Sequence, residues 1–166
     1  MAKEIQLTQG KVAIVDDDDY IKLIRCKWHC INNNGKYYAA TAIKLNAKWK
    51  IITMHRYILK PISTVFIDHI NGCGLDNRKE NLRFCTKAEN NINRIKNINN
   101  TSGFKGVVWN KLSNKWKSQI KYNSKLIYIG TYDDIIDAAK AYNEAAIKYH
   151  KQFANLNKID QNGLFI

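Results

Sequence analysis

Three residues whose side chains could together hydrolyse a phosphodiester lie near the middle of this chain of 166 residues. Asp68 and His69 follow an apolar run, and Asn90 lies further along. A histidine can take a proton from water near neutral pH, because its unperturbed pKa is about 6.5. A carboxylate and an amide oxygen are hard ligands that can hold Mg²⁺ and leave positions for phosphate and water. The residue types therefore predict metal-assisted hydrolysis, although the same residues also fit a turn and a helix cap.

The surrounding sequence predicts the elements that would position this set. The apolar run at 65–67 predicts a strand that ends at the Asp-His pair, and a glycine-containing loop leads to a returning strand at 81–85. Thr86 and Glu89 fit a capping box at the start of a helix, which places Asn90 one turn inside that helix. A hairpin crossed by a helix would aim the three side chains into one small space.

The same stretch resembles the HNH endonucleases, in the branch seen in phages and homing enzymes. The resemblance implies a ββα-metal fold in which His69 is the general base and Asp68 and Asn90 hold Mg²⁺ or Mn²⁺. It also implies that Asn81 braces the loop and orients His69. The third motif position is Asn rather than His, as in homing relatives. The matching motifs are Met54-His55-Arg56, Asp68-His69, Asp76-Asn77-Arg78, Asn81-Leu82-Arg83, and Asn90 with Asn93.

Basic side chains flank the expected site. We expect Arg78 and Arg83 to contact phosphate, because both lie next to the site and a guanidinium can bind phosphate through two hydrogen bonds. His55 and Arg56 have two interpretations, a phosphate contact or packing and hydrogen bonding within the domain.

The C-terminal part of the chain resembles the AP2 domain. Short β-like runs at 106–109, 115–121 and 125–130 precede a helical pattern at 133–150, which predicts three strands and one covering helix. The resemblance implies that the sheet enters the major groove of DNA. Residues 103–158 contain no Arg, and Lys lacks the planar group that binds guanine through two hydrogen bonds. We therefore expect weak specificity for bases and a larger share of contacts to phosphates. The expected DNA contacts by resemblance are Lys105, Lys115, Lys121, Tyr128 and Thr131, to which side-chain chemistry adds Trp109, Lys111 and Lys117. We expect Phe104, Trp116 and Tyr142 in the core, with one of Trp109 and Trp116 buried.

Charge favours a polyanionic partner. The chain has 27 Lys and Arg against 14 Asp and Glu, a net charge of +13, and residues 91–125 hold eight basic residues and no acidic one. We expect double-stranded DNA as the partner. No apolar run approaches the length of a membrane span, and residues 1–10 contain no apolar h-region, so we expect no signal peptide, no membrane association and an intracellular location, the cytoplasm of a bacterium or phage-infected host. We interpret the acidic run at 16–19 as a solvated turn.

The four cysteines, Cys26, Cys30, Cys73 and Cys85, are expected to be reduced. They lack the Cys-x-x-Cys spacing of a zinc knuckle, so we expect no zinc.

The fold class expected is α+β, with a nuclease domain followed by an AP2-like sheet and helix. The leading hypothesis is a metal-dependent endonuclease, of homing type, that nicks or cuts double-stranded DNA, with a monomer favoured. The alternative is a non-catalytic DNA-binding regulator built on a decayed nuclease scaffold, and an RNA-binding module is a third class. The expected boundaries are a nuclease domain at 1–97 with its core motif at 54–93, a linker at 98–102, an AP2-like domain at 103–158 and a tail at 159–166.

Overall fold

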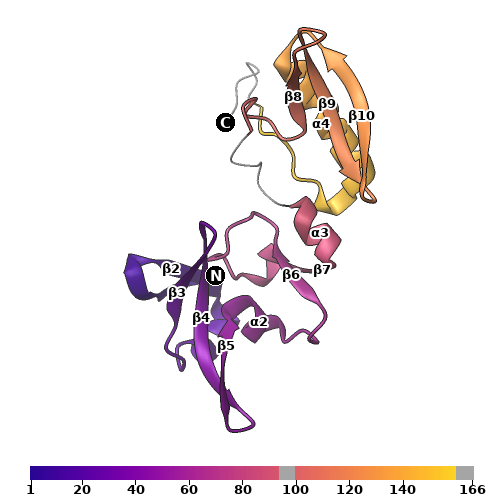
Figure 1. Cartoon of the computed structure of the whole chain (residues 1–166). Coiled ribbons are helices and arrows are strands. Elements are labelled where there is room, and N and C mark those ends of the chain that lie inside the picture. Colours follow the sequence, from indigo (N-terminus) through magenta and orange to yellow (C-terminus); the bar gives the residue numbers. More distant parts are fainter. Residues whose placement is uncertain (94–99, 160–166) are drawn as a thin grey trace. The chain divides into compact units, whose positions relative to one another are not determined.

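A computed structural model describes residues 1–93 and 100–159 (Figure 1). The chain divides into two compact units, Met1–Asn90 and Asn91–Ile166. Parts of the expected linker at 98–102 and of the expected tail at 159–166 lie outside the described residues.

The first unit is built from small antiparallel sheets: a β1–β2 hairpin, a sheet in the order β3-β4-β5, and a β6–β7 hairpin. Its strands are β1 (Ala2–Gln6), β2 (Val12–Asp16), β3 (His29–Asn33), β4 (Lys36–Leu45), β5 (Lys48–Thr53), β6 (Phe66–His69) and β7 (Leu82–Cys85). Its helices and 3₁₀ turns are η1 (Thr8–Gly10), α1 (Asp17–Leu23), α2 (Met54–Leu59) and η2 (Lys79–Asn81), and α3 (Lys87–Ile92) begins in this unit.

The core of the first unit lies between the N-terminal hairpin, α1 and the β3-β4-β5 sheet. Strand β2 alternates, so that Val15 is buried and Ile14 is exposed, as expected for a sheet with one covered face. The buried Trp28 ring meets the Tyr57 ring edge-on at 5.6 Å, and its indole N–H donates to the carbonyl oxygen of Leu23 at 2.8 Å. The indole therefore fills the core without leaving its only donor unsatisfied.

The interpretation of residues 16–19 as a solvated turn is wrong. Asp16 is the N-cap residue of α1, and the following acidic residues form its first turn, where the helix dipole favours negative charge. The run also bonds at long range: Asp16 Oδ2 accepts from the backbone N–H of Lys79 at 2.7 Å, and Lys79 Nζ lies 2.8 Å from Asp19 Oδ2. This acidic run therefore ties α1 to the segment that precedes β7.

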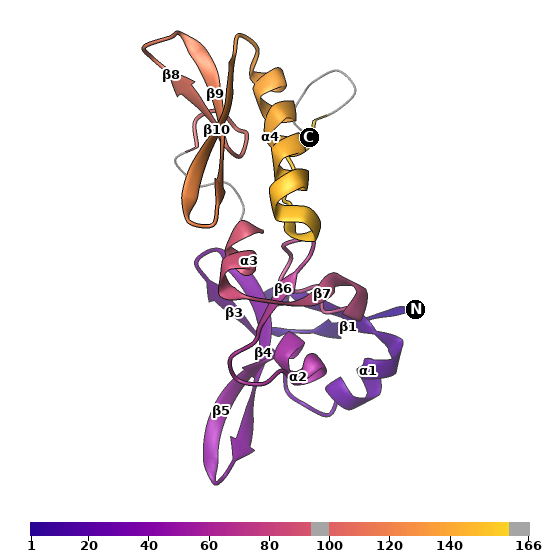
Figure 2. The same cartoon turned by 90° about the vertical axis from the view of Figure 1, so that its right-hand side faces the viewer.

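The second unit contains a three-stranded antiparallel sheet in the order β10-β9-β8, packed on one long helix (Figure 2). Small side chains on the buried side of the helix, such as Ala138 and Ala146, let it approach the sheet closely. Asp134 caps the helix by accepting from the backbone N–H groups of the second and third residues after it. The elements are β8 (Val107–Asn110), β9 (Lys115–Tyr122), β10 (Lys125–Tyr132), α4 (Ile135–His150) and η3 (Lys151–Phe153).

The α+β class is confirmed by the small antiparallel sheets and the few helices. Phe104 and Tyr142 are buried in the second unit as expected, whereas Trp116 is half-buried. Across residues 1–93 and 100–159, no helix combines the length and the apolar character that a membrane crossing would require.

Candidate active site

The Asp-His pair lies at the end of a short hairpin. Strands β6 and β7 pair antiparallel, with Asp68 opposite Arg83 and His69 opposite Leu82. Helix α3 follows directly, and its start is the expected capping box: Glu89 N–H donates to Thr86 Oγ1 at 3.2 Å, and the backbone N–H of Thr86 donates to Glu89 Oε2 at 2.8 Å. This local structure sets where Asn90 lies.

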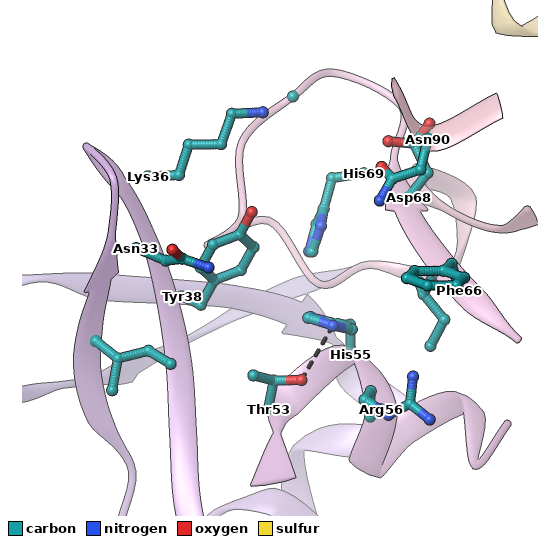
Figure 3. A pocket seen from close by; sticks show the side chains of 13 residues that line it. Asn33, Lys36, Tyr38, Thr53, His55, Arg56, Phe66, Asp68, His69 and Asn90 are labelled. Atoms are coloured by element: carbon teal, nitrogen blue, oxygen red, sulfur yellow. Dashed lines mark hydrogen bonds between the residues drawn. The ribbon is translucent and has the colours of Figure 1, made fainter. Parts of the chain in front are cut away.

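One cavity of about 320 Å³ brings the expected chemical groups together (Figure 3). Asp68 and His69 from β6 and Asn90 from α3 all line it. The opposite wall comes from the β3–β4 hairpin, from the end of β5 and from the start of α2. These further lining residues include Asn33, Lys36, Tyr38, Thr53, His55 and Arg56.

His69 is buried among aromatic rings. Its ring centroid lies 4.9 Å from that of His55, nearly edge-on, and 5.9 Å from that of Tyr38. Its Nε2 lies 3.5 Å from Oδ1 of the fully buried Asn77. Burial lowers the pKa of His69, although the Asn77 contact and the carboxylates of Asp68 and Asp76 oppose this shift. A neutral imidazole at physiological pH can accept a proton, so the environment suits a general base.

His55 and Arg56 both make internal contacts. Thr53 Oγ1 and His55 Nε2 lie within hydrogen-bond distance, at 3.0 Å. Burial, together with the charges of His69 and Arg56, lowers the pKa of His55 to about 3, so this ring stays neutral beside His69. Arg56 donates to the backbone carbonyl of Val65 at 3.1 Å. Of the two interpretations, the internal one matches these contacts.

Asn81 makes the contacts of a loop brace. Its Oδ1 accepts from the backbone N–H of Asn71 at 3.0 Å, and its Nδ2 donates to Asn71 Oδ1 at 3.0 Å and to the backbone carbonyl of Asp76 at 2.8 Å. In the described hydrogen bond of the His69 ring, the acceptor is instead Oδ1 of Asn77. Asn77 was not among the site residues predicted from the sequence, although it lies in the Asp76-Asn77-Arg78 motif.

The loop that carries Asn77 is also fixed from the N-terminal hairpin. The backbone N–H of Asn77 donates to the carbonyl of Ile14 at 2.7 Å, and the N–H of Ile14 donates to the carbonyl of Leu75 at 2.9 Å. Close packing holds the other side of the loop, because a Cβ on Gly74 would lie 2.5 Å from the ring of Tyr38. The loop therefore has little freedom to move around His69.

The two arginines expected at phosphate are held by carboxylates in the structure. Arg78 donates from Nε and Nη2 to the two carboxylate oxygens of Asp76 at 2.9 and 2.8 Å, which lowers the pKa of that carboxyl. Arg83 donates from Nε and Nη2 to Asp68 Oδ2 at 2.9 and 2.6 Å. A guanidinium carries five N–H donors, so these carboxylates do not by themselves prevent either arginine from contacting phosphate.

The donor chemistry of the cavity fits a hard divalent cation. In the described ranges, no three His, Cys, Asp or Glu side chains are grouped to hold a metal. A cation here would therefore need the amide oxygen of Asn90 in addition to Asp68. A single carboxylate with an amide oxygen suits Mg²⁺, which keeps several water molecules when it binds protein.

The sheet of the second unit presents one face away from α4. Pairing and alternation place Lys115, Lys117, Lys121, Tyr128 and Thr131 on this outer face. The Tyr128 hydroxyl and Thr131 Oγ1 lie 2.6 Å apart, and Lys115 Nζ lies 3.0 Å from Asp133. The structure thus gathers five of the eight expected DNA contacts of this unit on one surface.

The remaining three lie elsewhere. Trp109 pairs with Trp116 across β8 and β9, so it belongs to the face that packs toward α4, and the two rings lie 4.9 Å apart. Neither of the two is buried, because Trp109 is 42% exposed and Trp116 is half-buried. Lys105 donates from Nζ to the carbonyl of Ile92, and burial lowers its pKa to about 8. Lys111 is exposed in the turn after β8. Trp109 and Lys105 therefore do not lie on the outer face.

Comparisons with known proteins agree with this geometry. Residues 61–92, which include Asp68, His69 and Asn90, match the family model described as HNH endonuclease. Protein 3.8 of Escherichia phage T7 is 33% identical over 89 residues, covering 54% of this chain and 73% of that protein. The chain belongs to the HNH endonuclease family.

Two further relatives extend the similarity. An uncharacterized HNH endonuclease of Acanthamoeba polyphaga mimivirus is 28% identical over 141 residues, covering 81% of this chain and 72% of that protein. APETALA2-like protein 2 of Oryza sativa subsp. japonica is 35% identical over 57 residues, which are 34% of this chain and 13% of that protein. No solved structure gives a significant match.

Proposed function

We propose that this chain is a metal-dependent endonuclease of homing type that hydrolyses phosphodiester bonds in double-stranded DNA. The main support for this proposal is the cavity that Asp68, His69 and Asn90 line together. Burial lowers the pKa of His69 in this cavity and so favours its neutral form. Membership of the HNH family supports a nuclease, and the net charge of +13 supports a DNA substrate.

Each group in the cavity has a role in this proposal. His69 takes the proton of the attacking water, and the Asn77 side chain holds its ring. Asp68 and Asn90 would hold Mg²⁺ or Mn²⁺, which supplies positive charge to the phosphate and to the leaving oxygen. Lys36, on the opposite wall, adds positive charge where the DNA backbone would enter. His55 packs on His69 and keeps water from one side of its ring.

The second unit is proposed to hold the DNA. Its outer face carries Lys117 and Lys121 for phosphate contact and the hydrogen-bonded pair Tyr128 and Thr131 for base edges. The similarity to a plant AP2-like protein and the AP2-like order of three strands and one helix support this role. Because these charges are lysines, the surface should grip many sequences with a modest preference.

The test is cleavage of supercoiled plasmid by the full chain, with Mg²⁺, with Mn²⁺ and with EDTA. The wild type should nick with either metal, and His69→Ala should cut at least about a hundredfold more slowly, since a general base contributes roughly 10²–10⁴. His29→Ala removes a half-buried histidine outside the cavity and serves as the control. DNA binding by His69→Ala should persist.

The same cleavage assay also tests the two proposed metal ligands. Asp68→Ala and Asn90→Ala should both raise the Mg²⁺ concentration needed for half-maximal cutting, with Asp68 having the larger effect because it carries the charge. If the wild type leaves plasmid intact with every metal while it still binds DNA, the non-catalytic regulator becomes the better reading.

A further inference from the structure

The β4–β5 hairpin extends beyond the body of the first unit as an arm (Figures 1 and 2). We call residues 42–51 the hairpin arm. It exposes large apolar side chains: Trp49 is 70% exposed and Ile51 is 71% exposed. Both belong to β5, and neither joins the buried clusters of this unit. Exposed aromatic and aliphatic side chains that lie together on one element are typical of a binding surface.

All the charged side chains of the arm are basic. Lys44, Lys48 and Lys50 lie on it, and the sequence contains no Asp or Glu between Tyr20 and Ile67. None of the three lysines forms an ion pair with any residue that the structure describes. A cationic surface without internal counterions favours a polyanion, because each phosphate contact releases condensed counterions. A second copy of a chain with a net charge of +13 is a poorer electrostatic match.

The arm shares a sheet face with the candidate active site. In the register of β4 and β5, Lys44 lies opposite Trp49, Ala42 opposite Ile51, and Ala40 opposite Thr53. Alternation then places Trp49, Ile51 and Thr53 on one face, and Thr53 lines the cavity. From Thr53 to Trp49 the strand advances about 13 Å, at about 3.3 Å per residue. That length corresponds to about four base pairs at about 3.4 Å each.

We propose that the hairpin arm is a second DNA-binding site, which lies along the duplex on one side of the cleaved phosphate. Lys44 lies on the face of Trp49, and Lys48 and Lys50 lie on the opposite face, so the lysines contact the backbone on the two sides of a groove while Trp49 and Ile51 contact its sugars and base edges. A two-stranded β-ribbon has the width that the major groove admits. This proposal rests on the proposed function, because the cavity defines which phosphate is cleaved.

The first test measures binding of the full chain to a duplex of about 30 base pairs by fluorescence anisotropy in EDTA, where cutting does not interfere. Replacing Lys44, Lys48 and Lys50 together with Ala should lower the slope of log affinity against log salt by about 2.7, at about 0.9 per contact. The matched control replaces three exposed lysines outside the arm that likewise form no ion pair with the described residues, Lys22, Lys27 and Lys60, and its salt slope should stay close to that of the wild type.

The second test uses the apolar residues. Trp49→Ala should weaken binding about tenfold, equivalent to about 1.4 kcal/mol. Ile62→Ala, which removes a side chain that is 73% exposed away from the arm, should have no effect. Once the cut is mapped, duplexes shortened to fewer than about four base pairs on one side of it should lose more affinity for the wild type than for Trp49→Ala, which keeps only the lysine contacts of the arm.

The outcomes separate the two proposals. If the arm variants bind like the wild type with an unchanged salt slope while plasmid is still cut, the arm is not a DNA site and the proposed nuclease function stands. If plasmid is never cut but binding depends on the arm, the nuclease proposal fails alone. If Trp49→Ala leaves DNA affinity unchanged and converts a dimer to a monomer in sedimentation, the arm binds a second copy instead, which overturns the proposal.

Discussion

The candidate active site and the outer face of the second sheet use polar side chains in opposite ways. Around the cavity, Asn81 bonds to two other residues of its loop, Arg83 is bonded to Asp68, and Asn77 is fully buried. On the outer face, Lys121 is exposed, and the Tyr128 side chain bonds to its near neighbour Thr131.

This difference is what their proposed tasks require. Chemistry needs groups that are in position before the substrate arrives, since displacement by about 1 Å can cost about a hundredfold in rate. Binding of a polyanion tolerates mobile lysines, because much of the binding free energy comes from counterion release. We therefore expect substitutions near the cavity to have large individual effects and those on the outer face to have small, additive ones.

The sharpest test of a preorganised site is Asn77→Ala. Loss of the Asn77 side chain should slow cutting by about tenfold to a hundredfold, as for residues that orient a functional histidine. The Asn77 contact raises the pKa of His69, so its removal should move the acid limb of the pH–rate profile to lower pH. Asn71→Ala, which disturbs the loop without touching the ring, should slow cutting without moving that limb.

The preorganised site also lowers the stability of the folded chain in acid, through His55. His55 has a pKa of about 3 in the folded chain against about 6.5 unfolded, so its contribution to stability is complete above about pH 6.5. As pH falls from 6.5 toward 3, the unfolded chain binds the proton and stability declines by about 1.4 kcal/mol per pH unit. His55→Phe should flatten this dependence in urea titrations. An equally steep decline in the variant would contradict the assignment to His55.

The smallest effects are expected on the outer face. Replacing Lys117 and Lys121 with Ala should weaken binding by a similar factor on any sequence and lower the salt slope by about 1.8. Replacing Tyr128 or Thr131 should instead change the preference among sequences, by about 1–3 kcal/mol for each base pair read. A large loss of kcat in the variant without Lys117 and Lys121 would contradict this contrast between the active site and the outer face, because it would mean that these lysines act in the cleavage step.

Local sequence signals were enough to predict the hairpin and helix that carry Asp68, His69 and Asn90. An apolar run, a turn and a capping box act over a few residues, and the structure contains all three. The strands and the helix of the second unit were predicted for the same reason, since their periodicities are regular.

The opposite wall of the cavity could not be predicted in this way. Lys36 and Tyr38 lie on β4 and reach the site only through the pairing of β3, β4 and β5, which depends on contacts between distant residues. Strand β1 and helix α1 also lacked a clear local pattern. Trp109 was assigned to DNA because of its chemistry, but its face is decided by a register that single residues do not reveal.

The hydrogen bonds between Ile14 and the loop of Asn77 affect how much of this chain would be needed to transfer the nuclease site to another protein. The segment that matches the family model, residues 61–92, contains the chemical groups but not the strand that its loop lies against. Lys79 is likewise anchored to Asp16 and Asp19, which come about sixty residues earlier in the chain. A graft of the motif alone into another scaffold would carry the reactive side chains without their frame. The smallest transplantable unit therefore begins at the N-terminal hairpin, and a designer who moves this chemistry elsewhere must move β2 and α1 with it.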